Sequence, residues 1–414
     1  MIRVLHTADI HIGVENYSRT DPTTGLPTRL LDFLNVLDEA VDFALANDID
    51  LFIVAGDAYK SRDPSQTHQR ELAKRIIRLT ENNVSVFLLV GNHDLPNAVG
   101  RATSLEIFPT LAVPKTMIGN SLESYPVETK NGPIQIVAVP WVRRANLLTG
   151  AETRGLSFEQ INQKIQDLLA QRLLNLAKDL DPDIPAILTG HITVETATVG
   201  SERSMMLGTD YTLSPSNLAL PEFEYCALGH IHRTQTLWED PHLIYSGSLQ
   251  RVDFSEENDP KGFYVLDIEP TLPQGKRLQN VHFEEVNARR FITIDVNLKD
   301  SLHEPTAHVI KTIEENYVEN AVVRLRLQLA ASQESLLNEN AIRRALDSSA
   351  FVASISRDVE RPTRIRLGRD MTAETLSPIQ ALELYLDSRE SSNQDRKDLL
   401  DAARLLIENE EESS

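Results

Sequence analysis

The sequence combines 414 residues with a formal net charge of −20, so it is too long for one ordinary hydrophobic core and two or three domains are expected. An acidic chain repels nucleic acid at long range, which argues against a protein that coats DNA by bulk charge; a nuclease with bound cations is not excluded. The single cysteine, Cys226, excludes an internal disulfide, and no apolar run has the length that spans a bilayer. The first residues follow a strand pattern without a signal-peptide pattern, so we expect a cytoplasmic protein with no membrane segment.

Short β-branched and aliphatic runs, each ending in Gly, Asp, Asn or His, recur along the first two thirds of the chain. Such runs predict buried strands, and α/β sheets place their sites at the carboxyl ends of strands. The strands are predicted at 3–7, 50–54, 85–90, 134–139, 185–188, 225–228, 243–245 and 263–268. The polar clusters are Asp9 with His11, Gly56-Asp57, Gly91-Asn92-His93-Asp94, Gly190-His191 and Gly229-His230-Ile231-His232.

Helical patterns lie between these strands. Leucines and valines spaced three or four residues apart predict a helix over roughly 28–47. Ser65 is a suitable N-cap for a second helix that ends near residue 82, and Ser157 with Gln160 forms a capping-box pattern before a third helix that ends near Leu180. We therefore expect an α/β fold in which two packed β-sheets form a sandwich flanked by helices.

The pattern changes after a stretch over 270–280 that is rich in Pro and Gly and predicts a linker. Beyond it, alternating strands and two helices predict a small α+β domain over 285–370, so that 1–275 forms the first domain. Helices are expected at about 377–389 and 393–409, within a region, 371–414, that ends in an acidic tail. Their leucines exceed what two short helices bury between themselves, so these helices either dock on their own domain or bind a partner.

The polar clusters together have the composition of a two-metal site for phosphate-ester hydrolysis. Two cations a few Å apart lower the pKa of a water and neutralise charge on the phosphoryl oxygens. Asp57 is the candidate for a bridging carboxylate because the tight Gly56-Asp57 turn leaves its side chain at the sheet edge. Histidine and carboxylate ligands without a thiolate favour Mn²⁺, Fe or Zn²⁺ over Ca²⁺.

Each cluster also has a simpler interpretation when it is taken alone. Asp9 suits a capping role at a strand end, Gly-Asn-His-Asp suits a plain turn, and Gly-His-x-His suits two half-buried imidazoles. The set as a whole favours the metal site, because every cluster follows a predicted strand.

These clusters, in this order, resemble the calcineurin-like metallophosphoesterases. Further stretches narrow the resemblance to the SbcD family, the nuclease subunits of bacterial SbcCD complexes; these stretches are Gly200-Ser201-Glu202-Arg203, Gly208-Thr209, Tyr245-Ser246-Gly247-Ser248-Leu249 and Asp253-Phe254-Ser255-Glu256. The resemblance is specific over about 1–268, moderate over 285–370 and weak beyond.

The resemblance implies a role for each site residue. Asp9, His11 and His232 would hold one metal, Asn92, His191 and His230 would hold the other, and Asp57 would bridge them. His93 would stabilise or protonate the leaving oxygen beside the metals. Asp94 would orient His93 from behind.

The same resemblance implies an activity and partners. We expect Mn²⁺-dependent hydrolysis of DNA, by an exonuclease on duplex ends and an endonuclease at hairpins or single-stranded segments, in DNA repair, recombination and replication. The region 371–414 would bind an SbcC-like ABC ATPase subunit, and the small α+β domain would be a capping domain. A homodimer within a heterotetramer is expected. The chain has no Gly-x-x-x-x-Gly-Lys-Ser/Thr segment, so no ATP site is expected in it.

Several residues keep two interpretations. Lys60 stands where some relatives carry a further His, and it either contacts phosphate or is a solvated loop lysine. Arg203 is a candidate DNA contact, and Trp141 either packs or contacts nucleic acid. The arginines between 324 and 366 form either a DNA-tracking surface or surface ion pairs. Two other functions remain as alternatives: a stand-alone phosphodiesterase for small molecules, and a DNA-tethering scaffold with a silent site.

Overall fold

The structure, a computed structural model, describes residues 1–96, 100–142, 154–200, 212–298, 304–360, 378–387, 396–397 and 399–404. The chain divides into two compact units. The large unit comprises Met1–Val296, Thr306–Arg326 and Asn338–Ser356, and the small unit comprises Asn297–Pro305, Leu327–Leu337 and the described part of Arg357–Ser414. Among the described helices, none combines the length and the apolar character that crossing a membrane requires.

Two six-stranded sheets form the centre of the large unit. The strand order of the first sheet is β14 (Leu278–Glu285), β13 (Gly262–Ile268), β1 (Ile2–Thr7), β2 (Leu51–Val54), β3 (Ser85–Leu89) and β4 (Thr116–Gly119). The order of the second is β11 (Gln235–Glu239), β12 (His242–Tyr245), β10 (Tyr225–Gly229), β7 (Ala186–His191), β6 (Gly132–Val139) and β5 (Glu123–Thr129). In each sheet four neighbouring strands are parallel. The antiparallel pairings lie on one side of the first sheet, at β13 and β14, and at both edges of the second, at β11 and β5.

The side chains of each central strand pack in two directions because successive residues of a strand point to opposite faces. In β2, Leu51 and Ile53 face the second sheet, whereas Phe52 and Val54 pack under the helices. All four residues are buried, which explains why the strand is a continuous apolar run rather than an alternating one. The predicted sandwich of two packed sheets is confirmed.

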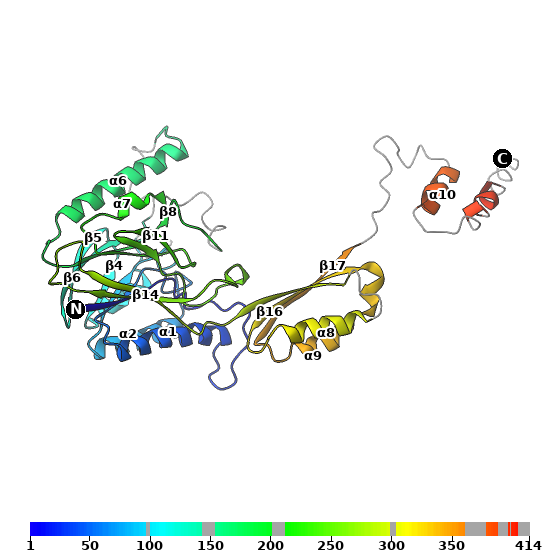
Figure 1. Cartoon of the computed structure of the whole chain (residues 1–414), viewed down its shortest axis with the longest axis horizontal. Helices are drawn as coiled ribbons and strands as arrows, with labels where there is room; N and C mark the ends of the chain where they lie inside the picture. Colours follow the sequence, from blue (N-terminus) through cyan, green and yellow to red (C-terminus); the bar gives the residue numbers. More distant parts are fainter. Residues whose placement is uncertain are drawn as a thin grey trace. The chain divides into compact units, whose positions relative to one another are not determined.

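Helices cover the two outer faces of the sandwich (Figure 1). On the first sheet lie α1 (Thr28–Ala46) and α2 (Gln66–Glu81); on the second lie α6 (Phe158–Lys178) and the short α7 (Pro215–Leu218). The predicted starts of two helices are confirmed. The Ser65 hydroxyl accepts a hydrogen bond from the His68 backbone N–H at the start of α2, and Ser157 forms a capping box with Gln160 at the start of α6.

The predicted linker over 270–280 is wrong, because β14 begins at Leu278 and pairs antiparallel with β13. The connection between these two strands runs over residues 269–277. Its last residue, Arg277, is buried; its guanidinium lies 3.6 Å from the Glu224 carboxylate and donates a hydrogen bond to the Pro182 carbonyl. The proline and glycine residues therefore build a hairpin connection that is attached to the second sheet.

A three-stranded sheet follows in the order β15 (Phe291–Asn297), β16 (Val322–Ala330) and β17 (Phe351–Glu360). Helices α8 (Pro305–Glu315) and α9 (Glu339–Ala345) connect its strands, as the sequence predicts for a small α+β part. The remaining described elements are η1 (Ser104–Glu106), α3 (Ile107–Thr110), β8 (Thr193–Val194), β9 (Thr212–Leu213), η3 (Phe254–Glu256), η4 (Ala331–Leu336) and α10 (Pro378–Asp387).

The strands of the two sheets end at one place. A backbone bridge joins Ala8, just after β1, to Ser248, just after β12. The Asp9 and His11 backbone N–H groups donate to the carbonyls of Gly56 and Asp57, so the segment after β1 continues alongside the segment after β2. Loops from both sheets therefore lie against each other at the carboxyl ends of the parallel strands.

His6 provides a test of the packing between the sheets. Burial lowers the pKa of His6 to about 3, and its ring nitrogens contact the Tyr225 hydroxyl and the Leu228 carbonyl across the interface. The unfolded chain binds a proton at His6 near pH 6.5 and the native state does not, so this residue removes stability as the pH falls from about 6.5 to about 3. We expect the free energy of unfolding of His6→Gln to depend less steeply on pH in this window, by up to about 1.4 kcal/mol per pH unit.

Urea denaturation of wild type and variant at pH 7, 6 and 5 measures this slope. The variant His282→Gln is the matched control, since His282 lies on β14 with 39% of its side chain exposed. Equal slopes for His6→Gln and wild type would contradict the expectation.

Candidate metal centre

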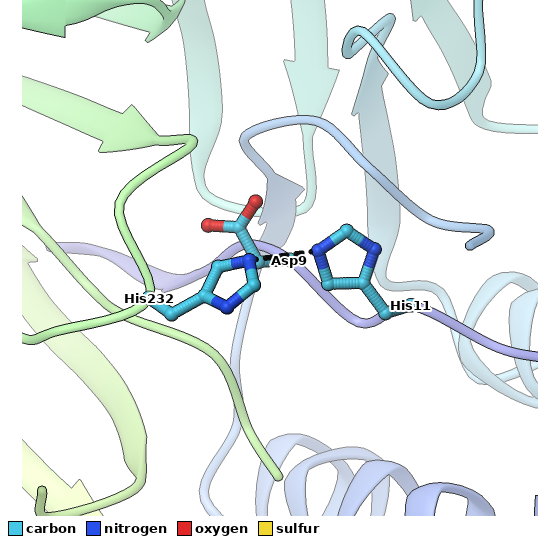
Figure 2. A group of neighbouring side chains, drawn as sticks. All are labelled: Asp9, His11 and His232. Atoms are coloured by element: carbon cyan, nitrogen blue, oxygen red, sulfur yellow. Dashed lines mark hydrogen bonds between the residues drawn. The ribbon is translucent and has the colours of Figure 1, made fainter. Parts of the chain in front are cut away.

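The first group of predicted ligands lies where the segment after β1 meets the loop after β10. The side chains of Asp9, His11 and His232 are buried and close enough for one ion to contact all three (Figure 2). Nε2 of His11 lies 2.9 Å from Nε2 of His232. Two imidazole nitrogens that face each other in a buried place compete for one proton, whereas a cation could accept the lone pairs of both.

A second group shares Asp9 with the first and adds Asp57 and His191. Oδ2 of Asp57 lies 3.4 Å from Nε2 of His191 and 3.9 Å from Nε2 of His11, so this oxygen lies between the two groups. Nε2 of His191 also lies 2.9 Å from Oδ1 of Asn92. The carboxylate of Asp57 therefore lies between side chains of both groups, and its predicted bridging role stays a prediction.

His230 and Trp141 complete this side of the centre. The His230 ring centroid lies 5.2 Å from that of His191, and its backbone N–H donates to both carboxylate oxygens of Asp9. The Trp141 ring lies 5.0 Å from the His230 ring. Trp141 thus packs against imidazoles of the centre, a position that the sequence left open.

The backbone at the centre adopts conformations that ordinary residues avoid. Asp9, His11, Asp57 and His230 all have positive φ angles, of 51°, 50°, 54° and 96°. A non-glycine residue in this region costs on the order of 1–3 kcal/mol, and such residues gather at functional sites where the surrounding structure enforces them. Four of the ten described non-glycine residues with positive φ therefore lie at this centre, where they turn side chains of both sheets toward one point.

Two glycines of the motifs are required by close approach. A Cβ at Gly56, whose φ is +99°, would lie 2.1 Å from Nδ1 of His191, and a Cβ at Gly91 would lie 2.1 Å from Oδ1 of Asp57. No side chain fits at such distances. The glycines before Asp57 and Asn92 therefore make room for the site's own side chains.

His93 lies beside the metal groups. Its backbone N–H donates to Oδ1 of Asp57 at 2.8 Å, and its ring lies 5.1 Å from the His11 ring. Nδ1–H donates to the Lys60 carbonyl at 2.8 Å, while Nε2 is buried without a hydrogen-bond partner among the described residues. The Lys60 carbonyl therefore fixes the tautomer of His93 and leaves Nε2 for a substrate.

The expected contact between Asp94 and His93 is replaced by a different one. The Asp94 carboxylate accepts hydrogen bonds from the backbone N–H groups of Ala58, Tyr59 and Gly91. It ties the loop after β2 to the loop after β3 instead of orienting the ring. A carboxylate has enough lone pairs to accept from several N–H groups that a tight turn leaves unpaired.

The outcomes for the predicted DNA contacts differ from residue to residue. The backbone N–H of Lys60 donates to the Ile12 carbonyl, and Lys60 is only half-exposed. Arg203 lies outside the described residues. Of the arginines in the three-stranded sheet and α9, Arg343 pairs with Glu339 and Arg324 bonds to Thr293, which favours the ion-pair and packing interpretation for these two.

Two acceptors outside the predicted set orient the imidazoles. Nδ1–H of His191 donates to the Ala55 carbonyl at 2.8 Å, and Nδ1–H of His232 donates to Oε1 of Glu256 at 2.8 Å. Ligating histidines commonly use one ring nitrogen in this way and present the other to the metal. The sequence indicates no role for Glu256 beyond its membership of a family-like stretch, so this contact was missed.

Electrostatics agree with a site made for cations. Burial raises the pKa of Asp9. Burial would also raise the pKa of Asp57, but the imidazoles of His191, His93 and His11 outweigh it, and that pKa lies far below its ordinary value. Burial lowers the pKa of His191, yet Asp57 outweighs burial and raises it. Without a metal the imidazolium supplies the positive charge that the carboxylate needs, and divalent cations are its natural replacement.

The donor set therefore fits divalent metals. It consists of carboxylate oxygens, an amide oxygen and imidazole nitrogens, which suit Mn²⁺, Fe or Zn²⁺. The orphaned Nε2 of His93 and the facing nitrogens of His11 and His232 are buried polar atoms that a metal or its substrate would satisfy.

The chain is similar in sequence to known proteins. It is 29% identical over 286 residues to the SbcD component of the SbcCD nuclease of Rhodobacter capsulatus, covering 64% of this chain and 66% of the relative. It is 27% identical over 284 residues to the SbcD component of the SbcCD nuclease of Escherichia coli K12, covering 66% of each. The chain thus spans about 66% of the length of these curated relatives.

Similarity to solved structures is lower. The TT1561 protein of Thermus thermophilus aligns at a TM-score of 0.37 and 13% identity over 69% of this chain and 98% of that protein. A dimetal phosphatase from Danio rerio aligns at a TM-score of 0.34 and 11% identity over 64% of this chain and 92% of that protein.

More than half of the chain matches one protein family. Residues 2–234 match the calcineurin-like phosphoesterase family, and this range contains every predicted metal ligand and His93. The range covers more than half of the 414 residues, and the chain belongs to the calcineurin-like phosphoesterase family.

Proposed function

We propose that the chain is the nuclease subunit of an SbcCD-type complex and hydrolyses DNA phosphodiesters at a two-metal site. The observation that carries the proposal is the pair of buried donor groups that share Asp9 and have Oδ2 of Asp57 between them. The DNA substrate is supported by the similarity to the SbcD components of SbcCD nucleases. Mn²⁺ is the proposed metal, with exonuclease action on duplex ends and endonuclease action at hairpins or single strands.

Each proposed ligand has a place in this mechanism. Asp9, His11 and His232 would hold one cation, Asn92, His191 and His230 would hold the other, and Asp57 would be shared between them. When bound, the two cations supply charge neutralisation for the phosphoryl oxygens and acidify a water at neutral pH. The Ala55 carbonyl keeps the Nδ1 proton of His191 away from the centre, so that Nε2 is the atom that binds.

His93 acts on the substrate itself. Because its Nδ1–H is held by the Lys60 carbonyl, any proton exchanged with the leaving oxygen is exchanged at Nε2. The backbone N–H of His93 meanwhile holds Oδ1 of Asp57, which couples the position of the His93 ring to the bridging carboxylate. Substitution of His93 should therefore impair turnover more than metal binding.

The decisive experiment separates ligation from catalysis. The full chain with Mn²⁺ should degrade end-labelled duplex DNA, and EDTA should abolish the reaction. We expect Asp57→Ala to lose metal and activity together. We expect His93→Leu to retain both metals, counted by calorimetric titration, and to lose about 100- to 10,000-fold in rate, which is the usual contribution of a positioned acid or base.

His282→Leu is the matched control, since His282 lies on β14 with 39% of its side chain exposed, and the variant should behave as wild type. Cleavage of a small phosphodiester by wild type while DNA stays intact, even with the ATPase partner added, would replace the nuclease by a small-molecule phosphodiesterase. Metal binding without any hydrolysis would favour the silent scaffold.

The partner of this chain is proposed to be an SbcC-like ABC ATPase bound through the C-terminal helices, in a heterotetramer with two copies of each chain. In α10, Leu386 is buried, whereas Leu399 in the described segment 399–404 is 50% exposed. An exposed leucine on a helix is a candidate anchor for a helix-in-groove contact.

We expect Leu399→Asp to weaken co-purification with the ATPase subunit at least about tenfold, the loss typical of an interface anchor. Asp401→Ala, a change at a neighbouring exposed position, should leave the complex intact. Mn²⁺ binding should be the same in both variants. Undiminished co-purification of Leu399→Asp would move the interface elsewhere.

A further inference from the structure

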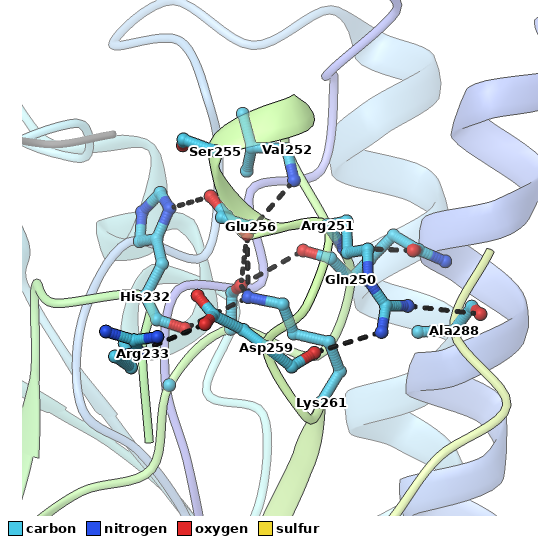
Figure 3. Close-up of polar contacts among 12 residues, drawn as sticks. His232, Arg233, Gln250, Arg251, Val252, Ser255, Glu256, Asp259, Lys261 and Ala288 are labelled. Atoms are coloured by element: carbon cyan, nitrogen blue, oxygen red, sulfur yellow. Dashed lines mark hydrogen bonds and ion pairs between the residues drawn. The ribbon is translucent and has the colours of Figure 1, made fainter. Parts of the chain in front are cut away.

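Glu256 is a buried carboxylate that lies next to the metal centre without belonging to either donor group. It is 1% exposed and lies in η3, the short turn Phe254–Glu256. Oε1 accepts the Nδ1–H of His232 at 2.8 Å, and Oε2 accepts hydrogen bonds from Lys261 Nζ at 2.6 Å and from the Val252 backbone N–H at 3.2 Å (Figure 3). A fourth bond comes from the Ser248 hydroxyl at 3.3 Å.

Lys261 is equally buried and uses its ammonium fully. Nζ donates to Oε2 of Glu256, to the Ser248 hydroxyl at 2.9 Å and to the His232 carbonyl at 3.0 Å. A buried ammonium with fewer than three acceptors would carry a large desolvation cost, and so would a buried carboxylate without a cation. The pair is neutral as a whole, so neither charge is left uncompensated.

The two residues hold His232 at two separate points. Glu256 holds the ring at Nδ1, and Lys261 holds the backbone carbonyl of the same residue. The Nδ1 proton is thereby directed away from the centre. Nε2 then carries the lone pair that faces His11 at 2.9 Å, where the first donor group converges.

We propose that Glu256 is a positioning residue for His232, and that Lys261 is the counter-ion that keeps Glu256 in place and fixes the backbone of His232. The inference rests on the proposed two-metal function. The inference concerns one of the two cation sites, the one formed by Asp9, His11 and His232, where a carboxylate would orient a ligating histidine. The other cation site has a neutral carbonyl, that of Ala55, in the corresponding position behind His191.

Among the described residues, only one of the two cation sites has a carboxylate behind its imidazole. A role of Glu256 in positioning His232 can therefore be distinguished from a role in stabilising the fold. A carboxylate behind an imidazole increases the basicity of the ligand, and loss of such a partner commonly lowers metal affinity about 10- to 100-fold. If Glu256 acts through His232, only the cation site that contains His232 weakens. If the ion pair only stabilises the fold, both sites weaken together or neither does.

The experiment is a calorimetric Mn²⁺ titration of the metal-free full chain. The double variant Glu256→Leu/Lys261→Met removes the acceptor and replaces both charges by apolar groups of similar size, so that no buried charge is left alone. We expect two Mn²⁺ sites in wild type, and in the double variant one site that is weakened about 10- to 100-fold beside one that is unchanged. Glu256→Gln keeps an acceptor for Nδ1–H and should weaken the same site by less.

Glu257→Gln is the matched control. Glu257 is the next residue along the chain, and its carboxylate accepts hydrogen bonds from the Thr293 backbone N–H and hydroxyl, both at 2.6 Å, instead of from His232. The control should bind Mn²⁺ as wild type does at both sites. It separates an effect on His232 from a general effect of losing a charge near this turn.

The outcomes are distinct. Two sites in wild type and the same two affinities in the Glu256 variants would overturn the positioning role while leaving the proposed function intact. Equal weakening of both sites would also overturn it, in favour of a structural ion pair. Failure of wild type to bind Mn²⁺ would overturn the proposed function itself. If the double variant does not fold, a selective loss in Glu256→Gln supports the inference, and its absence there contradicts the inference.

Discussion

Burial of the Asp57 carboxylate among imidazoles is the interaction on which the rest of the site depends. Its side chain is 2% exposed, and its oxygens lie within hydrogen-bonding or ion-pair distance of His11 after β1, of His93 after β3 and of His191 at the end of β7. A charge at this depth is tolerated only with compensating charges around it. The two sheets bring those compensating groups together because their parallel strands end at the same place, and the same balance of charges makes the place receptive to divalent cations.

The backbone conformation also contributes to the geometry of the metal centre. Asp9, His11, Asp57 and His230 hold positive φ angles, and Gly56 and Gly91 leave space that their neighbours' functional groups occupy. Such conformations are unfavourable in isolation and persist because the packed sandwich enforces them. The packed core between the sheets therefore holds the ligand side chains close together even without a bound metal.

The loop after β12 connects the metal centre with the three-stranded sheet. Within η3 and the residue after it, Glu256 bonds to His232 while Glu257 bonds to Thr293 of β15. The ring of Phe254, from the same turn, packs against Phe291 at a centroid distance of 4.9 Å. One short turn therefore contacts a candidate metal ligand, His232, and two residues of β15, Phe291 and Thr293.

Local patterns in the chain were enough to predict the inner strands β1, β2, β3, β6, β7, β10, β12 and β13, the helix starts at Ser65 and Ser157, and the order of the polar clusters, because these follow from periodicity and capping chemistry. The outer strands β4, β5, β11 and β14 were not predicted. Convergence of the clusters also followed from the rule that parallel strands expose their carboxyl ends at one edge. Three further facts emerge from the folded molecule alone: Lys60 rather than Asp94 orients His93, Glu256 stands behind His232, and residues 270–280 join two strands rather than two domains. Those facts depend on contacts between residues far apart in the chain, for which no local pattern carries a signal.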